Sequence, residues 1–166
     1  MMDDNYVLPL QAKAVSATGI SHVNGKPEDI AYLTLFYENQ LFAHIHVNWL
    51  APVKVRRTLI GGDQKMIVYD DLEPSEKIKV YDKGITVNTG VEGTYQVLVG
   101  YRTGDMWAPK VDGAEALRVE VMHFLHCIEQ NETPLTDGHA GLRVVKILEA
   151  ATKSMSLQGQ YVELAG

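Results

Sequence analysis

This sequence has a single cysteine, no long apolar run and fewer basic than acidic residues. Its 166 residues include one cysteine, Cys127, so an internal disulfide is excluded and a reducing cytoplasm is the expected compartment. No apolar run approaches the roughly 18 residues of a membrane-spanning helix, and the acidic N-terminus does not resemble a secretory signal. With 15 basic and 21 acidic residues, the net charge is −6, which disfavours non-specific nucleic-acid binding. We therefore expect neither a membrane nor a nucleic acid as partner.

The sequence also lacks the short motifs of the common cofactor and hydrolase folds. It has no G-x-S-x-G, no P-loop and no CxxC pair. Gly90 and Gly93 have neither the third glycine nor the strand-to-helix setting of a dinucleotide fingerprint. We predict that this chain by itself binds no cofactor.

Composition and periodicity indicate one globular domain. Hydrophobic residues make up 46% of the chain and charged residues 22%, as in ordinary globular proteins. Residues 1–13 are expected to be irregular, and 14–166 to form the domain. Short β-branched and aromatic runs separated by turn residues predict strands. The expected strands are 14–23, 30–38, 41–50, 54–61, 65–70, 76–81, one near 95–101, and 161–164.

Two helices are predicted after the strands. The first begins at Asp112, with Glu115 completing a capping box, and ends near Asn131. The second begins at the cap Asp137 and ends before Gly159. Strands first and helices last predict an α+β fold, an open, mostly antiparallel sheet of about six to eight strands with two helices packed on one face. The strand 30–38 is apolar on both sides, so the open face is expected to meet a second domain or a symmetric partner.

The most informative segment runs from Trp49 to Asp71. If residues 51–53 form a three-residue hairpin loop, Asn48 pairs with Arg56, and the polar rows of both strands share one face. On that face Lys54 and Arg56 would lie roughly 6.6 Å apart, which suits a diphosphate or a carboxylate. A two-residue loop would separate the rows. A solvated sheet face without ligand is the other interpretation of the same pattern.

Two histidines of the preceding strand offer a metal-binding alternative. His44 and His46 alternate onto one side of the strand 41–50, and His22 or Asp105 could supply a third ligand. This pattern would suit a cupin-like metal enzyme. Cys127 lies in an amphipathic helix without an activating base and is interpreted as a packed thiol.

Three segments carry a resemblance to a known family. They are W-L-x-P-x-K-x-R followed by K-M-x-V-Y-D-D within 49–71, then YRTGDMWAP, and then PLTDGHAGLRVVKILEAATKSM. From about Val15 to Val162 the chain resembles the C-terminal domain of the Gfo/Idh/MocA (glucose-fructose oxidoreductase and inositol dehydrogenase) family. It is most similar to the branch acting on sugars or sugar nucleotides. The resemblance implies a dihydrodipicolinate-reductase-like sheet that lines a substrate pocket and forms a homodimer or larger oligomer.

The resemblance also implies what lies outside this chain. In the family an N-terminal Rossmann domain binds NAD or NADP, and an Asp/His catalytic helix precedes the first strand of the second domain. The sequence is therefore expected to begin after the cofactor motif and the catalytic helix, to contain no catalytic residue and not to turn over alone. A stand-alone scaffold that dimerises through its sheet is the alternative from another class.

Six residues are predicted to face the sugar substrate or an interface. They are Lys54, Arg56, Asn48, Trp49 as a wall, Tyr101 and Arg102. A structural hydrogen-bonding corner is an equal alternative for Tyr101 and Arg102.

Overall fold

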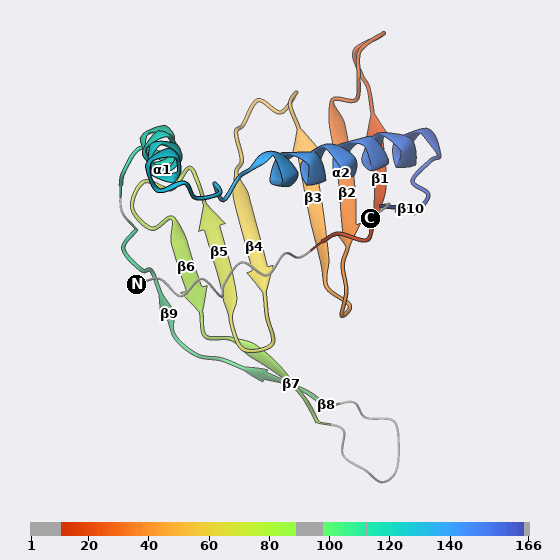
Figure 1. Ribbon diagram of the computed structural model, residues 1–166. Coiled ribbons are helices and arrows are strands. Elements are labelled where there is room, and N and C mark those ends of the chain that lie inside the picture. Colours follow the sequence, from red (N-terminus) through yellow and green to blue (C-terminus); the bar gives the residue numbers. More distant parts are fainter. Residues whose placement is uncertain (1–10, 89–97, 112, 165–166) are drawn as a thin grey trace. The chain divides into compact units, whose positions relative to one another are not determined.

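The computed structural model describes residues 11–88, 98–111 and 113–164 (Figure 1). The chain divides into two compact units, one of Met1–Pro52 with Glu120–Gly166 and one of Val53–Val119. None of the helices in the described ranges is long and apolar enough to cross a lipid bilayer.

The first unit is built on a four-stranded antiparallel sheet with the order β10-β1-β2-β3. Its strands are β1 (Ala14–Ile20), β2 (Ile30–Phe36), β3 (Phe42–Asn48) and β10 (Val162–Glu163). Val15 pairs with Leu35 and with Val162, so these three side chains share one face of the sheet. This face carries the hydrophobic core.

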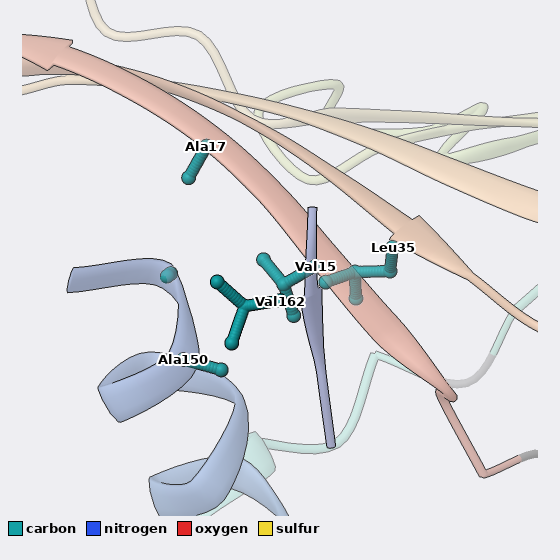
Figure 2. Packing of buried hydrophobic residues seen from close by; sticks show 6 residues of the cluster. Val15, Ala17, Leu35, Ala150 and Val162 are labelled. Atoms are coloured by element: carbon teal, nitrogen blue, oxygen red, sulfur yellow. The ribbon is translucent and has the colours of Figure 1, made fainter. Parts of the chain in front are cut away.

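Helix α2 (Gly138–Ser156) covers that face and contacts β1 and β10 (Figure 1). Asp137 is its N-cap, as predicted, and the carboxylate accepts a hydrogen bond from the Ala140 amide at 2.7 Å. Figure 2 shows Ala150 of the helix directed toward Val162 and Val15. The core is therefore a layer of small and branched side chains between one helix and the sheet. It consists of Val15, Ala17, Leu35, Ala150, Ala151 and Val162.

The end of α2 is fastened to β1 by a buried hydroxyl. The backbone amide of Ala17 donates to Oγ of Ser154 at 2.8 Å, and that hydroxyl donates to the carbonyl of Gln160 at 2.6 Å. Gly159 has a φ of +88°, a value that favours glycine, and a Cβ there would lie 2.9 Å from Cγ2 of Thr18. The chain can therefore turn tightly from the helix into β10.

The second unit holds a further antiparallel sheet of order β4-β5-β6-β9 and the ribbon β7-β8. Its strands are β4 (Arg57–Gly61), β5 (Met66–Asp70), β6 (Ile78–Tyr81), β7 (Gly84–Asn88), β8 (Leu98–Arg102) and β9 (Met106–Trp107). Helix α1 (Ala116–Gln130) begins at the end of this unit; from Glu120 onward it belongs to the first unit, and its one buried residue is Cys127. The predicted α+β class is confirmed.

Several predicted boundaries are close, and others need correction. The strands expected to begin at 14, 30 and 41 do begin within one residue of those positions. Strands β7 and β9, in contrast, were not predicted from the sequence. Helix α1 begins at Ala116, and the predicted cap Asp112 lies outside the described residues. The predicted strand near 95–101 is observed as β8.

The pairing of Asn48 with Arg56, expected if residues 51–53 formed a three-residue hairpin loop, is not among the described strand ladders. Strands β3 and β4 belong to different sheets, and β4 begins only at Arg57. The reason lies in Asn48, whose Oδ1 accepts hydrogen bonds from the amides of Leu50 and Ala51, at 2.9 and 3.1 Å, and so ends β3 in a turn. Strand alternation therefore does not extend to residues 54–56.

Candidate functional site

The face of the first sheet opposite α2 presents two rows of polar and aromatic side chains. Because directly paired residues point to the same side, the register defines the rows. We call these six residues the imidazole face: Ser16, Thr34 and His44 in one row, Thr18, Tyr32 and His46 in the other. The predicted polar side of the strand 41–50 is therefore present in the structure. None of the six carries a formal charge when its histidines are neutral.

Tyr32 lies at the centre of this face. Its ring stacks on His46 with the centroids 4.4 Å apart and an interplanar angle of 3°, and on His44 at 6.4 Å and 30°. Nδ1 of His44 is 3.1 Å from the hydroxyl of Thr34. Tyr32 remains 46% exposed. The rings thus form an ordered, outward-facing aromatic surface.

Trp49 and Asn48 lie where β3 ends. Trp49 is 64% exposed, and its amide donates to the carbonyl of Asp29 at 3.1 Å, which ties the end of β3 to the start of β2. Oδ1 of Asn48 accepts the two backbone hydrogen bonds of the turn, and the side-chain NH₂ group remains available to donate hydrogen bonds to a ligand. The exposed indole suits the wall role predicted from the sequence.

A histidine–aspartate pair lies beside this end of the sheet, and sequence reasoning missed it. The carboxylate of Asp29 is fully buried; it accepts hydrogen bonds from the His22 amide at 2.6 Å and from Nδ1 of His22 at 2.8 Å. A carboxylate only accepts, so Nδ1 carries the proton. The sequence did carry a sign of this pair: Asp29 stands directly before the strand that begins at residue 30, and His22 stands shortly after the strand that precedes it.

The pKa of Asp29 lies below its ordinary value. Burial alone would raise this pKa, but the side-chain and backbone hydrogen bonds from His22 outweigh burial and lower it. Stabilisation from the ionised carboxylate is therefore complete above the ordinary carboxyl pKa of about 3.9 and is lost as pH falls through the lower folded-state value.

This pair gives a testable pH dependence. Asp29→Asn should destabilise the protein at pH 7, because the two His22 hydrogen bonds use both carboxylate oxygens, and an amide has one oxygen to accept and a nitrogen that cannot. The difference from the unsubstituted chain should shrink as pH falls below about 4. Urea unfolding at pH 7 and pH 3 measures both quantities. The neighbouring exposed Glu28→Gln is the control, and a difference that stays constant with pH would contradict the assignment.

The predicted basic pair separates into two different environments. Arg56 forms an ion pair with Asp71 at 3.3 Å, and the same carboxylate lies 3.7 Å from Nζ of Lys77. The hydrogen bond from Arg56, and then that from Tyr69, lower the pKa of Asp71. Lys54 is exposed and forms no ion pair with any part of the chain that the structure describes. Of the two predicted cations, Lys54 is the one available to an anion.

Arg57, which sequence reasoning did not select, contributes to a concave region of the second sheet. Its guanidinium contacts Oδ2 of Asp70 at 2.6 Å, and this hydrogen bond lowers the pKa of Asp70. Leu59 and Val68 line the apolar part of a cavity of about 260 Å³. The charged groups around it are largely paired with one another, as in Lys79 with Glu76 at 3.2 Å.

Tyr101 and Arg102 are placed only by their backbone. They lie in β8, paired with Ile85 and Gly84 of β7, and their side chains lie outside the described residues. Their predicted substrate contact stays a prediction.

The metal site considered as an alternative is not present in the described ranges 11–88, 98–111 and 113–164. No three His, Cys, Asp or Glu residues there are placed to hold an ion together. His22, proposed as a third ligand for His44 and His46, is bound to Asp29 instead.

Comparison with known proteins decides the family. Residues 6–164 match the Gfo/Idh/MocA family described as "Oxidoreductase family, C-terminal alpha/beta domain". The chain belongs to this family. No curated protein sequence matches it.

Solved structures of this oxidoreductase family share the fold. UDP-N-acetylglucosamine 3-dehydrogenase GnnA from Acidithiobacillus ferrooxidans is 20% identical, with a TM-score of 0.66 over 89% of this chain and 40% of that one. Aldose-aldose oxidoreductase from Caulobacter crescentus, solved with glycerol, is 17% identical, with a TM-score of 0.67 over 94% and 42%. A putative NADPH-dependent oxidoreductase from Desulfitobacterium hafniense is 19% identical, with a TM-score of 0.62 over 93% and 42%. The chain thus spans about two fifths of the length of these structures.

Proposed function

We propose that the chain is the substrate-binding and oligomerisation domain of a cytoplasmic NAD(P)-dependent oxidoreductase that acts on a sugar or sugar nucleotide. The family match makes it the C-terminal domain of an oxidoreductase. Two of the solved relatives are named for sugar or sugar-nucleotide substrates, which supports this substrate class. In this proposal the chain supplies substrate contacts, and the reacting hydride and proton are handled elsewhere in the parent enzyme.

The cofactor is assigned to a Rossmann domain of the parent protein. A dinucleotide site needs parallel strands joined through a helix, with a glycine-rich turn at the helix start. Every ladder among the described strands is antiparallel, and α1 and α2 both follow the strands of the second unit. The described residues therefore do not fit a nicotinamide dinucleotide, and we derive no catalytic step from them.

The observation that carries the substrate assignment is the exposed Trp49, with Lys54 close by in sequence. An indole face packs against the apolar side of a sugar ring, and an unpaired ammonium group complements a phosphate. Asn48 can donate its amide hydrogens to sugar hydroxyl groups. In this proposal the imidazole face does not bind substrate and is covered by a second copy of the chain.

Nuclear magnetic resonance of the chain tests the substrate site. Titration with UDP-N-acetylglucosamine should shift the indole N–H signal of Trp49 and leave that of Trp107, the second tryptophan, in place. Lys54→Ala should weaken binding roughly three- to tenfold, because an exposed ammonium–phosphate contact contributes of the order of 1 kcal/mol. Lys26→Ala, in the exposed turn before β2, is the matched control.

Separate titrations with UDP and with free N-acetylglucosamine show which half of the ligand each residue contacts. The proposal expects the Lys54→Ala effect with UDP and the Trp49 shift with the sugar. Equal shifts of Trp49 and Trp107, or no shift of either, would contradict the assignment of this site.

A further inference from the structure

We propose that a cavity on the second sheet binds a neutral sugar ring. The cavity has a volume of about 260 Å³, and its lining comes from strands β4, β5 and β6 and from the connection between β5 and β6. We call it the β5 pocket, after the strand that contributes Val68 and Asp70 to the lining. Its lining includes none of Asn48, Trp49 and Lys54, so this inference goes beyond the proposed function and does not depend on it.

Strand register gives the β5 pocket an apolar floor beside charged groups. Leu59 pairs with Val68, and the next pair on the same side of the sheet is Arg57 with Asp70. Lys79 is the partner of Val68 in β6 and points to that side as well. The two apolar side chains can therefore contact the C–H face of a sugar ring, while the charged groups reach the hydroxyl groups at its edge.

The formal charges around the β5 pocket sum to zero. Arg57 forms an ion pair with Asp70 at 2.6 Å. Lys79 forms another with Glu76 at 3.2 Å. A phosphate in this pocket would meet three carboxylates, and a metal ion would meet three cations, so the balance of charge favours an uncharged ligand over either ion. The charged lining residues are Arg57, Lys77, Lys79, Asp70, Glu73 and Glu76.

Both donors and acceptors of hydrogen bonds remain available in the β5 pocket. Arg57 uses Nε and Nη2 for Asp70, which leaves the hydrogens of Nη1 for a ligand. The carboxylate of Glu73 accepts hydrogen bonds, and the hydroxyl of Tyr81 donates or accepts; neither forms a hydrogen bond with any residue that the structure describes. The hydroxyl groups of a sugar also donate and accept. This mixed set of groups therefore complements a polyhydroxylated ring.

The volume of the β5 pocket limits the ligand to a single ring. Pockets for drug-sized ligands span roughly 300–1,000 Å³. At about 260 Å³ the β5 pocket lies below that range, so a monosaccharide suits it and a whole sugar nucleotide does not. Binding should be weak, with a dissociation constant in the millimolar range, because each sugar hydroxyl only replaces a water that bonded the same group.

Methyl signals of the isotope-labelled chain test the proposal by nuclear magnetic resonance. Titration with D-glucose should give saturable shifts of the Leu59 and Val68 methyl groups, and equal shifts at low and high salt because the ligand is uncharged. The exposed methyl groups of Leu135 should not shift. Sorbitol, an open-chain polyol, should bind at least threefold more weakly than glucose, and inorganic phosphate should leave Leu59 and Val68 in place.

Two substitutions remove available groups and leave both ion pairs of the β5 pocket intact. Glu73→Ala and Tyr81→Phe should each raise the dissociation constant for glucose at least threefold, with unchanged circular dichroism. The matched controls are Glu115→Ala and Tyr161→Phe, two exposed residues that do not line the pocket, and both should bind as the unsubstituted chain does. Trp49→Ala should likewise leave glucose binding at Leu59 and Val68 unchanged.

Several outcomes would overturn the inference. Leu59 and Val68 signals that do not move with glucose, or that move no more than those of Leu135, would exclude a sugar site here. Shifts with phosphate that weaken at high salt would assign the pocket to an anion, and equal binding of sorbitol would rule out recognition of a ring. Loss of the shifts in Trp49→Ala would show that this is not a separate site, whereas none of the other failures bears on the proposed function.

Discussion

Leu35→Ala is expected to lower the free energy of unfolding by about 2–5 kcal/mol, the range for truncating a buried leucine. Leu35 is 5% exposed and belongs to the buried core cluster, where it pairs with Val15 of β1. Three other members of this cluster, Ala17, Ala150 and Ala151, have side chains too short to fill the space that the missing methyl groups would leave. Urea denaturation with an unchanged m-value measures the loss.

The matched control for this substitution is Leu135→Ala. Leu135 is 72% exposed in the connection between the two helices, and it undergoes the same chemical change. We expect an effect within about 0.5 kcal/mol there, as for other exposed positions. Comparable losses at the two leucines would mean that the core is not where the structure places it.

Ser154→Ala is expected to cost about 1–3 kcal/mol, although it removes a single oxygen atom. That hydroxyl is completely buried; it accepts the amide hydrogen of Ala17 and donates to the carbonyl of Gln160. Alanine would leave the buried Ala17 amide without this acceptor and would remove a donor from the carbonyl of the exposed residue Gln160.

Ser156→Ala, two residues further along α2, provides the comparison. Its hydroxyl is exposed and donates to the carbonyl of Lys153 at 2.7 Å, so water can replace the bond. We expect a change of less than about 0.5 kcal/mol there. Hydrogen exchange gives a second measurement, because the Ala17 amide should lose protection in the Ser154 variant only. Retained protection at Ala17 would contradict the proposed role of the hydroxyl.

Local sequence signals predicted which side chains share the polar side of β3. Alternation placed His44, His46 and Asn48 on one side of their strand, and pairing with β2 confirms that they share the face with Tyr32 and Thr34. The Asp137 cap was likewise predictable, because a capping side chain needs only its own first helical turn. Such features depend on residues within a few positions of each other.

Predictions that needed pairing between segments succeeded less often. The pairing of Asn48 with Arg56 is not among the described strand ladders, because the asparagine oxygen bonds the next amides and ends the strand. Arg56 was expected to face the substrate or an interface, and its ion pair with Asp71, fifteen positions away, was not foreseen. The contact of His22 with Asp29 was missed because nothing in either residue alone specifies the other.

What the sequence by itself determined is the α+β class, the amphipathic second helix with its cap, and the polar row of β3. Periodicity and capping are properties of neighbouring residues, so they are visible without coordinates. Tertiary structure alone decided that Arg56 is paired with Asp71 and that the carboxylate of Asp29 is buried against His22. It also decided that Ser154 of α2 bonds to Ala17 of β1, 137 positions away in the sequence. These outcomes depend on which distant groups meet, and only the folded chain brings such groups within hydrogen-bonding distance.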